Sequence, residues 1–308
     1  MYVVVIAATI AAALAAGARA ERRYGPGAQR AARVVLGAML YALVPFIAFF
    51  NIDRLRIDAN VGGGIALGYV ALALTGGVAY LVGRRALDLG RPATGALMCG
   101  AIQGNTGYLG LPLAAAVLGA SRLGEAVAYD ALVQSPTLLV AGFGIGAAFG
   151  ARTGAGAGAR VRAFLARNPP LLAVIAGLLA PRSLAPDSLV HLSRLLVFAL
   201  LPLGFFAVGV TLAAESEDGA ARFPPPFTRA IAATLGLRLL LAPALLVALA
   251  APLIDLPTPY LLLAAMPCGI NGLVIAHAYG LDVGLSAGAI AWSTAVVAVV
   301  GVLTVSLI

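Results

Sequence analysis

Long apolar blocks, separated by short connections that carry most of the charged residues, form the pattern of this chain. Most of the blocks are long enough to cross a bilayer as a helix, which takes about 20 apolar residues. Transmembrane barrels instead show short segments of alternating hydrophobicity. The pattern predicts an all-α integral membrane protein with ten transmembrane helices, numbered here as spans 1 to 10. The expected spans are 2–18, 31–51, 61–83, 92–119, 124–150, 168–181, 187–213, 227–253, 258–281 and 283–307.

Spans 4 and 9 each contain residues that interrupt a helix, "GNTGYLGLP" in span 4 and "MPCGING" in span 9. Unpaired backbone groups cost several kcal/mol each in lipid, so such backbone persists only where protein or a water-filled cavity supplies partners. Paired interruptions in two corresponding halves indicate the substrate site of a secondary transporter. The alternative is that these glycines only allow close helix packing. The candidate substrate-binding residues are Gln103, Gly104, Asn105, Thr106, Gly107, Pro112, Pro267, Cys268, Gly269 and Asn271.

The two halves of the chain are similar around a proline in span 2 and a proline in span 7. "LYALVPFIAFF" aligns without gaps with "VFALLPLGFFA", and Pro45 matches Pro202. Because a unit of five spans is odd in number, two copies have opposite orientations, as in many secondary transporters. We therefore expect two inverted five-helix repeats. The expected units are a first repeat at 1–150, a flexible linker at 151–167 and a second repeat at 168–308.

Composition and charge agree with a membrane protein. The chain is 62% hydrophobic and 10% charged, whereas soluble domains are about 45–50% apolar and about 25% charged. All twenty basic residues are arginines; fourteen lie on one side of the predicted membrane, five lie on the other, and Arg238 lies within span 8. Arginine excess marks the cytoplasmic side, which predicts a cytoplasmic linker and external termini in a bacterial inner membrane. Topology and anionic lipid headgroups account for the net charge of +8 without nucleic acid.

Several segments resemble the auxin efflux carrier family in its bacterial branch, within the bile acid/arsenite/riboflavin-type transporter superfamily. The resemblance rests on "GNTGYLGLP" followed by "AAAVLG", on "RNPPLLAVIAGLL" in span 6 and on "LLPLGFFAVGVTL" in span 7. It also rests on a Pro-x-x-x-Asn core followed by "AHAYGLD" in span 9, although Cys268 and Gly269 depart from the family pattern there. The resemblance covers essentially the whole chain, but the long central loop of plant members is absent.

This resemblance implies that spans 4 and 9 cross at their breaks, next to the substrate. It further implies a scaffold of spans 1, 2, 6 and 7 that forms a homodimer, and a moving transport domain of spans 3–5 and 8–10. The implied substrate is a small organic anion: auxin in plants, and a dicarboxylate such as malate or malonate in bacteria. We therefore expect a secondary carrier for a mono- or dicarboxylate that works by alternating access of the elevator type. Its expected partners are the anion, membrane lipid and a second copy of the chain, with no nucleic acid and no cofactor.

Two alternatives stay open, a sodium-coupled carrier like the bile acid symporters and a transporter-like receptor that binds its ligand without moving it. Bile acid symporters hold sodium with acidic and amide side chains, whereas the breaks here contain amides but no carboxylate. An enzyme is not expected, because Asp130 and Asp282 do not share a depth as the two aspartates of an intramembrane protease do. Cys99 and Cys268 lack the further ligands that a metal site needs.

Ionisable residues inside the spans are functional candidates by default. Asp130 lies in span 5 with Gln134 one turn further on the same face, Arg238 lies in span 8, and His277 lies in span 9. Arg238 can attract the anion or pair with Asp130, and Asp130 or His277 can carry a coupling proton, so coupling to protons or sodium stays open. The structural alternatives are an arginine that snorkels or bonds carbonyls, an aspartate at the outer interface and a histidine that only packs.

The orientation can be tested by labelling single cysteines in intact cells. We expect Thr153→Cys, in the linker, to be protected from an impermeant thiol reagent added outside, because the arginine excess places the linker in the cytoplasm. A cysteine added at the C-terminus is expected to react. Labelling of Thr153→Cys from outside would reverse the assigned orientation.

Overall fold

The computed structural model of the protein is built from helices over the residues it describes, which are 2–52, 55, 58–151, 169–217 and 225–306. Within this part of the chain, seven helices are long and apolar enough to cross a membrane. They are Val4–Tyr24, Pro26–Ile52, Ala59–Ala86, Ala120–Phe149, Asp187–Ala214, Arg229–Ala250 and Val283–Val300. The protein is therefore a multi-pass membrane protein of the all-helical class.

Short π-helical or 3-10 turns divide several of these spans into labelled pieces. The α-helices are α1 (Tyr2–Tyr24), α2 (Pro26–Ala38), α3 (Val44–Ile52), α4 (Ala59–Leu81), α5 (Arg91–Ile102), α6 (Leu111–Val117), α7 (Leu123–Tyr129), α8 (Ser135–Thr137), α9 (Phe143–Phe149), α11 (Pro169–Leu179), α12 (Asp187–Leu196), α13 (Leu200–Glu217), α14 (Arg229–Leu235), α15 (Ala242–Ala250), α16 (Thr258–Ala264), α17 (Asn271–Tyr279) and α18 (Val283–Ser306). The π-helical turns are η1 (Met39–Leu43), η2 (Val82–Ala86), η3 (Thr106–Gly110), η5 (Asp130–Gln134), η6 (Leu138–Gly142) and η9 (Gly236–Leu241). The 3-10 turns are η4 (Ala120–Arg122), η7 (Arg182–Leu184) and η8 (Val197–Ala199).

Three expected spans are absent from the seven long helices, for two different reasons. The expected spans 92–119 and 258–281 are interrupted in their middle, where α5 gives way to η3 and α6, and α16 to α17. The expected span 168–181 is a helix, but α11 is only 11 residues long. Of the expected linker at 151–167, all residues except Ala151 lie outside the described part of the chain.

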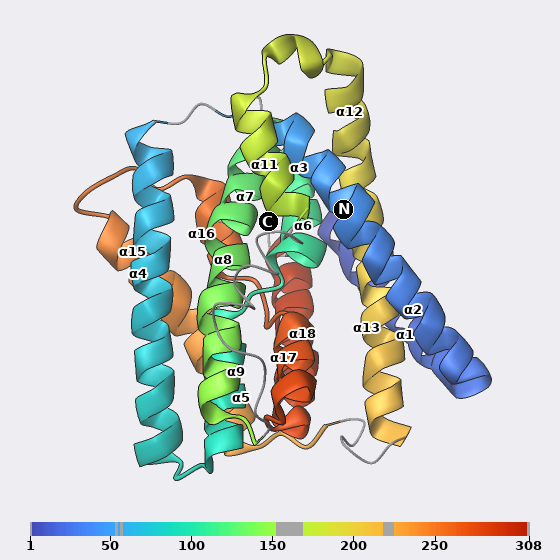
Figure 1. Ribbon diagram of the computed structural model, residues 1–308, viewed down its shortest axis with the longest axis vertical. Coiled ribbons are helices and arrows are strands. Elements are labelled where there is room, and N and C mark those ends of the chain that lie inside the picture. The colour runs from blue at the N-terminus through green and yellow to red at the C-terminus, as the bar shows by residue number, and fades with distance from the viewer. Residues whose placement is uncertain (1, 53–54, 56–57, 152–168, 218–224, 307–308) are drawn as a thin grey trace.

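Helices that are distant in sequence pack side by side. On the right of Figure 1, α1 runs along α13 with α2 beside them, while α4 lies on the left and contacts α5 and α15. At the top of the view α11 and α12 pack on α3, and lower in the middle α18 contacts both α14 and α5. The interrupted segments also meet, since α5 contacts α17, and α16 contacts η3 and α6.

Small residues allow the closest of these helix contacts. A Cβ atom added at Gly17 on α1 would lie 2.1 Å from the Phe206 carbonyl oxygen, and one at Gly209 on α13 would lie 2.3 Å from that of Leu14. Close backbone approach at glycine is the usual way in which membrane helices associate, because lipid gives no hydrophobic drive between them. The two glycines thus hold α1 directly against α13.

Candidate functional site

The two interrupted segments bond to each other through their backbones. Gly104 and Cys268 form an isolated antiparallel bridge. On either side of it, Asn105 N–H donates to the Pro267 carbonyl at 2.8 Å and Gly269 N–H donates to the Gln103 carbonyl at 2.9 Å. We call this contact between residues 103–105 and 267–269 the crossing. Each break therefore supplies partners for backbone groups that the other leaves without helical bonds.

Local sequence explains why both segments unwind here. Pro267 has no N–H and disfavours helical conformation in the residue before it. Gly104 and Gly269 have no side chain, and a Cβ atom at Gly269 would lie 2.8 Å from the Gly104 carbonyl oxygen. Pro112 instead lies just after the π-helical turn η3, within the helical stretch Thr106–Val117. The glycines thus let the two backbones approach, and Pro267 limits the helix before it.

A cavity of about 250 Å³ lies at the crossing. It is lined by Leu40, Val44, Gln103, Gly104, Asn105, Thr106, Gly107, Tyr108, Asp130, Gln134, Ser135, Leu138, Phe143, Pro170, Gly269, Ile270 and Asn271. Most of the candidate residues taken from the sequence line this cavity together, including Asp130 and Gln134 from the neighbouring span. Pro112, Pro267, Cys268, Arg238 and His277 are not part of the lining.

Four amide side chains surround the cavity. Gln103 and Gln134 are buried, with the Gln103 Nε2 atom and both polar atoms of Gln134 lacking a partner among the described residues. The side chains of Asn105 and Asn271 likewise make no hydrogen bond within the described part of the chain. Buried polar groups are nearly always bonded, so a cluster of free amides around one cavity indicates a polar ligand.

Helix N-termini add partial positive charge to the same cavity. Asn271 begins α17, and Thr106 and Gly107 begin the helix that continues from η3 into α6. The helix dipole makes this end partly positive, although the N–H groups of Gly272 and Leu273 already donate to the Gly269 and Ile270 carbonyls. Two N-termini and four amides make the cavity suitable for an anion.

Asp130 places one carboxylate in the cavity. It is the first residue of the π-helical turn η5, and it accepts a hydrogen bond from the Thr106 hydroxyl at the start of η3. Asp130 and Gln134 are one turn apart on η5, as their spacing predicts, and both line the cavity. The two breaks themselves contain no carboxylate, as the sequence shows. The fold brings the carboxylate of Asp130 to the cavity from another helix.

Arg238 lies behind Gly104 and is fully buried. A Cβ atom added at Gly104 would lie 2.2 Å from Arg238 Nη2, so the guanidinium packs directly against the crossing. Its Nε atom donates to the Met266 carbonyl at 2.8 Å, and Nη2 donates to the Ala264 carbonyl at 3.1 Å. Arg238 therefore bonds backbone carbonyls, and no ion pair joins it to Asp130 among the described residues.

The other candidates lie elsewhere. Cys99 and Cys268 are buried free thiols, and no group of three or more His, Cys, Asp or Glu residues among those described could hold a metal. His277 is on an exposed face of α17, and Asp282 accepts a hydrogen bond from Leu285 N–H at the start of α18. The sequence analysis missed Tyr108 in the lining, although it stands inside the "GNTGYLGLP" motif.

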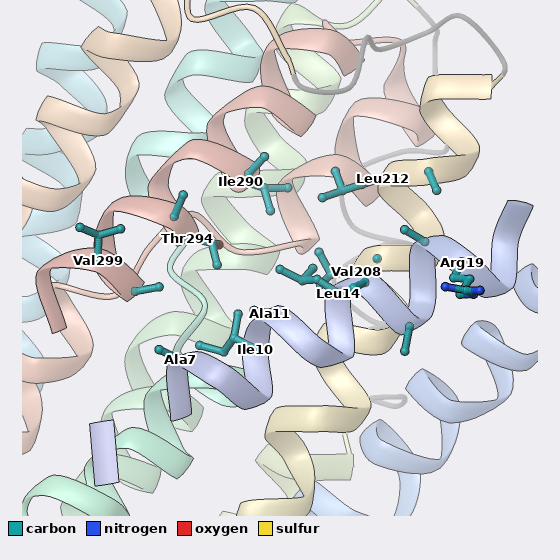
Figure 2. A pocket seen from close by; sticks show the side chains of 18 of the residues that line it. Ala7, Ile10, Ala11, Leu14, Arg19, Val208, Leu212, Ile290, Thr294 and Val299 are labelled. Carbon is teal, nitrogen blue, oxygen red and sulfur yellow. The ribbon is translucent and has the colours of Figure 1, made fainter. Parts of the chain in front are cut away.

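A second hollow differs from the crossing cavity in both size and chemistry. It is a groove of about 940 Å³ between α1, α13 and α18, lined mainly by alanine and larger aliphatic side chains. Figure 2 shows Arg19 at one end of it and Val299 at the other, with Leu14, Val208 and Leu212 between them. Such a surface suits lipid chains and offers little to a small polar ligand.

Comparison with known proteins agrees with this architecture. Residues 163–305 match the family described as membrane transport protein. Over this stretch, which is just under half of the chain, the chain is similar to that family. The match confirms the resemblance found in the sequence motifs.

Two archaeal relatives of the chain are described as uncharacterized transporters. The chain is 29% identical to one from Methanothermobacter thermautotrophicus over 271 residues, which is 85% of this chain and 83% of the relative. It is 25% identical to one from Methanocaldococcus jannaschii over 198 residues, 60% of this chain, and spans only 61% of that relative's length.

The geometry of the crossing predicts that alanine substitution lowers stability strongly at Gly269 and only weakly at the nearby Gly272. We expect Gly269→Ala to lower the free energy of unfolding by about 1–3 kcal/mol, because the new Cβ meets the Gly104 carbonyl oxygen. Gly272→Ala on α17 is the matched control, since a Cβ there meets nothing within 4 Å. Thermal denaturation in detergent measures both variants. Equal melting temperatures would show that the contact at Gly269 is not tight.

Proposed function

We propose that this protein is a secondary carrier for a small organic anion, a mono- or dicarboxylate, which binds in the cavity at the crossing. The observation that carries the proposal is a set of four amide side chains around one cavity between two broken segments, with no side-chain hydrogen bond to any described residue. Amides donate and accept hydrogen bonds without carrying charge, so they can hold a carboxylate and release it again. A permanently charged binding group would hold the anion more tightly and release it more slowly.

The electrostatic surroundings favour a negative ligand. The N-termini of α17 and of the η3–α6 helix begin at the cavity, and the Arg238 guanidinium lies behind Gly104. Helix N-termini facing an anionic group are a recurring feature of transporters built from discontinuous helices. Together these groups place positive potential on the side of the cavity formed by the crossing.

Asp130 opposes that potential and suggests proton coupling. A second negative charge about 6 Å from a carboxylate costs about 3 kcal/mol at an effective dielectric constant of about 20. We therefore propose that the anion binds when Asp130 is protonated, so that a proton travels with it. The helices and turns that contact η5 carry the titratable groups Tyr69 and Tyr80 on α4, Tyr108 on η3, and Glu125 and Tyr129 on α7. The tyrosines stay neutral between about pH 5 and about pH 8, and Glu125 forms an ion pair with Arg122 at 2.8 Å. Arg238 stays charged over the same range.

The carrier mechanism that we propose is alternating access of the elevator type in a fold of two inverted five-helix repeats. The close packing of α1 on α13, and of α11 and α12 on α3, supports a scaffold of spans 1, 2, 6 and 7. The contacts of α4 with α5 and α15, and of α18 with α5 and α14, support a separate transport domain. We further propose that the protein forms a homodimer in the inner membrane and that lipid fills the groove of Figure 2, with anionic headgroups near Arg19 and Arg22.

Asparagine variants test the site. We expect Asn105→Ala and Asn271→Ala each to weaken substrate binding about five- to more than a hundredfold, because a lost buried hydrogen-bond partner costs roughly 1–3 kcal/mol. A thermal-shift screen of purified protein against mono- and dicarboxylates identifies the ligand. Affinity for that ligand and its uptake into liposomes are then measured in each variant; uptake also separates a carrier from a receptor.

Asn60→Ala is the matched control, because Asn60 is outside the cavity lining and accepts a hydrogen bond from Asp255 N–H. It is expected to keep wild-type affinity. If both Asn105→Ala and Asn271→Ala bind the ligand with wild-type affinity, the site assignment is wrong. If both variants misfold, the asparagines serve to support the backbone, and other groups must bind the substrate.

A substitution at Asp130 tests the proton. Asp130→Asn imitates the protonated carboxyl group, so we expect it to bind the anion equally well from about pH 8 to about pH 5. Wild-type affinity is expected to rise as the pH falls, since protonation removes the repulsion. Asp282→Asn is the control, because asparagine caps a helix as well as aspartate and the substrate titrates identically in both experiments. The same pH profile in all three proteins would exclude Asp130 as the proton carrier.

A further inference from the structure

Arg238 is a fully buried cation in the middle of a membrane-spanning helix. It lies in the π-helical turn η9, between α14 and α15. Its guanidinium donates to three backbone carbonyls, those of Met266 at 2.8 Å, Ala264 at 3.1 Å and Leu263 at 3.4 Å. Charged side chains inside a membrane are rare and mark functional positions.

The three carbonyls that accept from Arg238 lie together at the C-terminal end of α16. Leu263 and Ala264 are the last residues of α16, and Met266 lies in the break that follows. The last carbonyls of a helix generally lack intrahelical partners, and the helix dipole gives this end partial negative charge. Of the three, the Leu263 carbonyl also accepts a bond from Met266 N–H at 3.2 Å. In transporters with discontinuous helices, such carbonyls commonly coordinate the coupling cation.

We propose that the guanidinium of Arg238 is a resident cation at the position that a coupling sodium ion would otherwise take, so that the carrier works without sodium. This inference rests on the proposed function. Arg238 supplies one positive charge and directs its N–H groups at oxygen atoms, and it does not lose its proton in proteins. A sodium ion bound to the same carbonyls would be repelled by the positive charge of the guanidinium.

The position of Gly104 extends the argument from one break to both. A Cβ atom at Gly104 would lie 2.2 Å from Arg238 Nη2, so the guanidinium lies against the span 4 break while it bonds the span 9 break. A bound cation in a coupled carrier holds the two breaks in the arrangement that binds substrate. Arg238 holds the two breaks in that arrangement permanently. Transport of the anion is then coupled to a titratable group such as Asp130 and not to a bound cation.

The first test uses the wild-type protein. We expect its apparent melting temperature, and its uptake of the anion into liposomes, to be unchanged when potassium replaces sodium. The melting temperature needs no substrate, so it tests the inference even if no transported anion is found. Stabilisation of the wild-type protein by sodium over potassium, or uptake that requires sodium, would overturn the inference.

The second test removes the resident cation. Arg238→Met keeps similar length without charge, and in potassium it is expected to melt about 5 °C or more below the wild-type protein, since several carbonyls lose their donor. Sodium is expected to restore part of this loss in a concentration-dependent manner, because the carbonyls are then free to bind it. Arg84→Met is the matched control: Arg84 is exposed and donates to the Leu89 carbonyl at 2.7 Å. It is expected to show no sodium response.

The outcomes are distinct. Wild-type stability and uptake of Arg238→Met in potassium would overturn the inference, and so would a loss that sodium does not restore, because Arg238 would then be a structural residue only. If Arg238→Met does not fold in either salt, Arg238→Lys decides. The lysine keeps the charge, so uptake without sodium is expected at a reduced rate, whereas sodium dependence would overturn the inference.

Discussion

Backbone hydrogen bonding in a medium without water is the constraint on which the rest of this structure depends. A helix that unwinds inside the membrane leaves N–H and C=O groups that lipid cannot satisfy. Here two unwound stretches satisfy one another, through the bonds from Asn105 N–H to the Pro267 carbonyl and from Gly269 N–H to the Gln103 carbonyl. Neither break would be stable alone, so the two halves of the chain depend on each other at this point.

The same arrangement explains where the polar side chains go. Because the backbones bond to each other at the crossing, the amides of Asn105 and Gln103 are not needed for that role. Gln134 approaches from the neighbouring span, and its amide has no hydrogen-bond partner among the described residues. Other backbone groups at the crossing are bonded from behind, where Ser293 accepts a bond from Cys268 N–H at 3.0 Å and Arg238 donates to carbonyls at and just beyond the end of α16. The cavity side is thus left available for a ligand.

The sequence predicted the helical class and the positions of both breaks, because glycine, proline and asparagine in an apolar block have a clear physical meaning. It also predicted that Asp130 and Gln134 share a face. It could not predict which way that face points, since the orientation depends on the π-helical turn η5 and on the bond from Thr106. The partners of Arg238 were equally hidden: pairing with Asp130 and bonding to carbonyls are both reasonable for a buried arginine, and only the fold distinguishes them.

The charges around the crossing differ in kind, and this difference bears on mechanism. Arg238 is bonded to carbonyls, fully buried and unable to lose its proton, so its charge is constant through a transport cycle. Asp130 borders the cavity and is the only acidic residue in its described lining, so its charge can follow the contents of the cavity. A fixed cation with a variable anion gives a site whose net charge depends on one proton. A carrier of the proposed elevator type crosses the membrane both loaded and empty, and it would need such a variable because the empty site lacks the charge that the substrate brings.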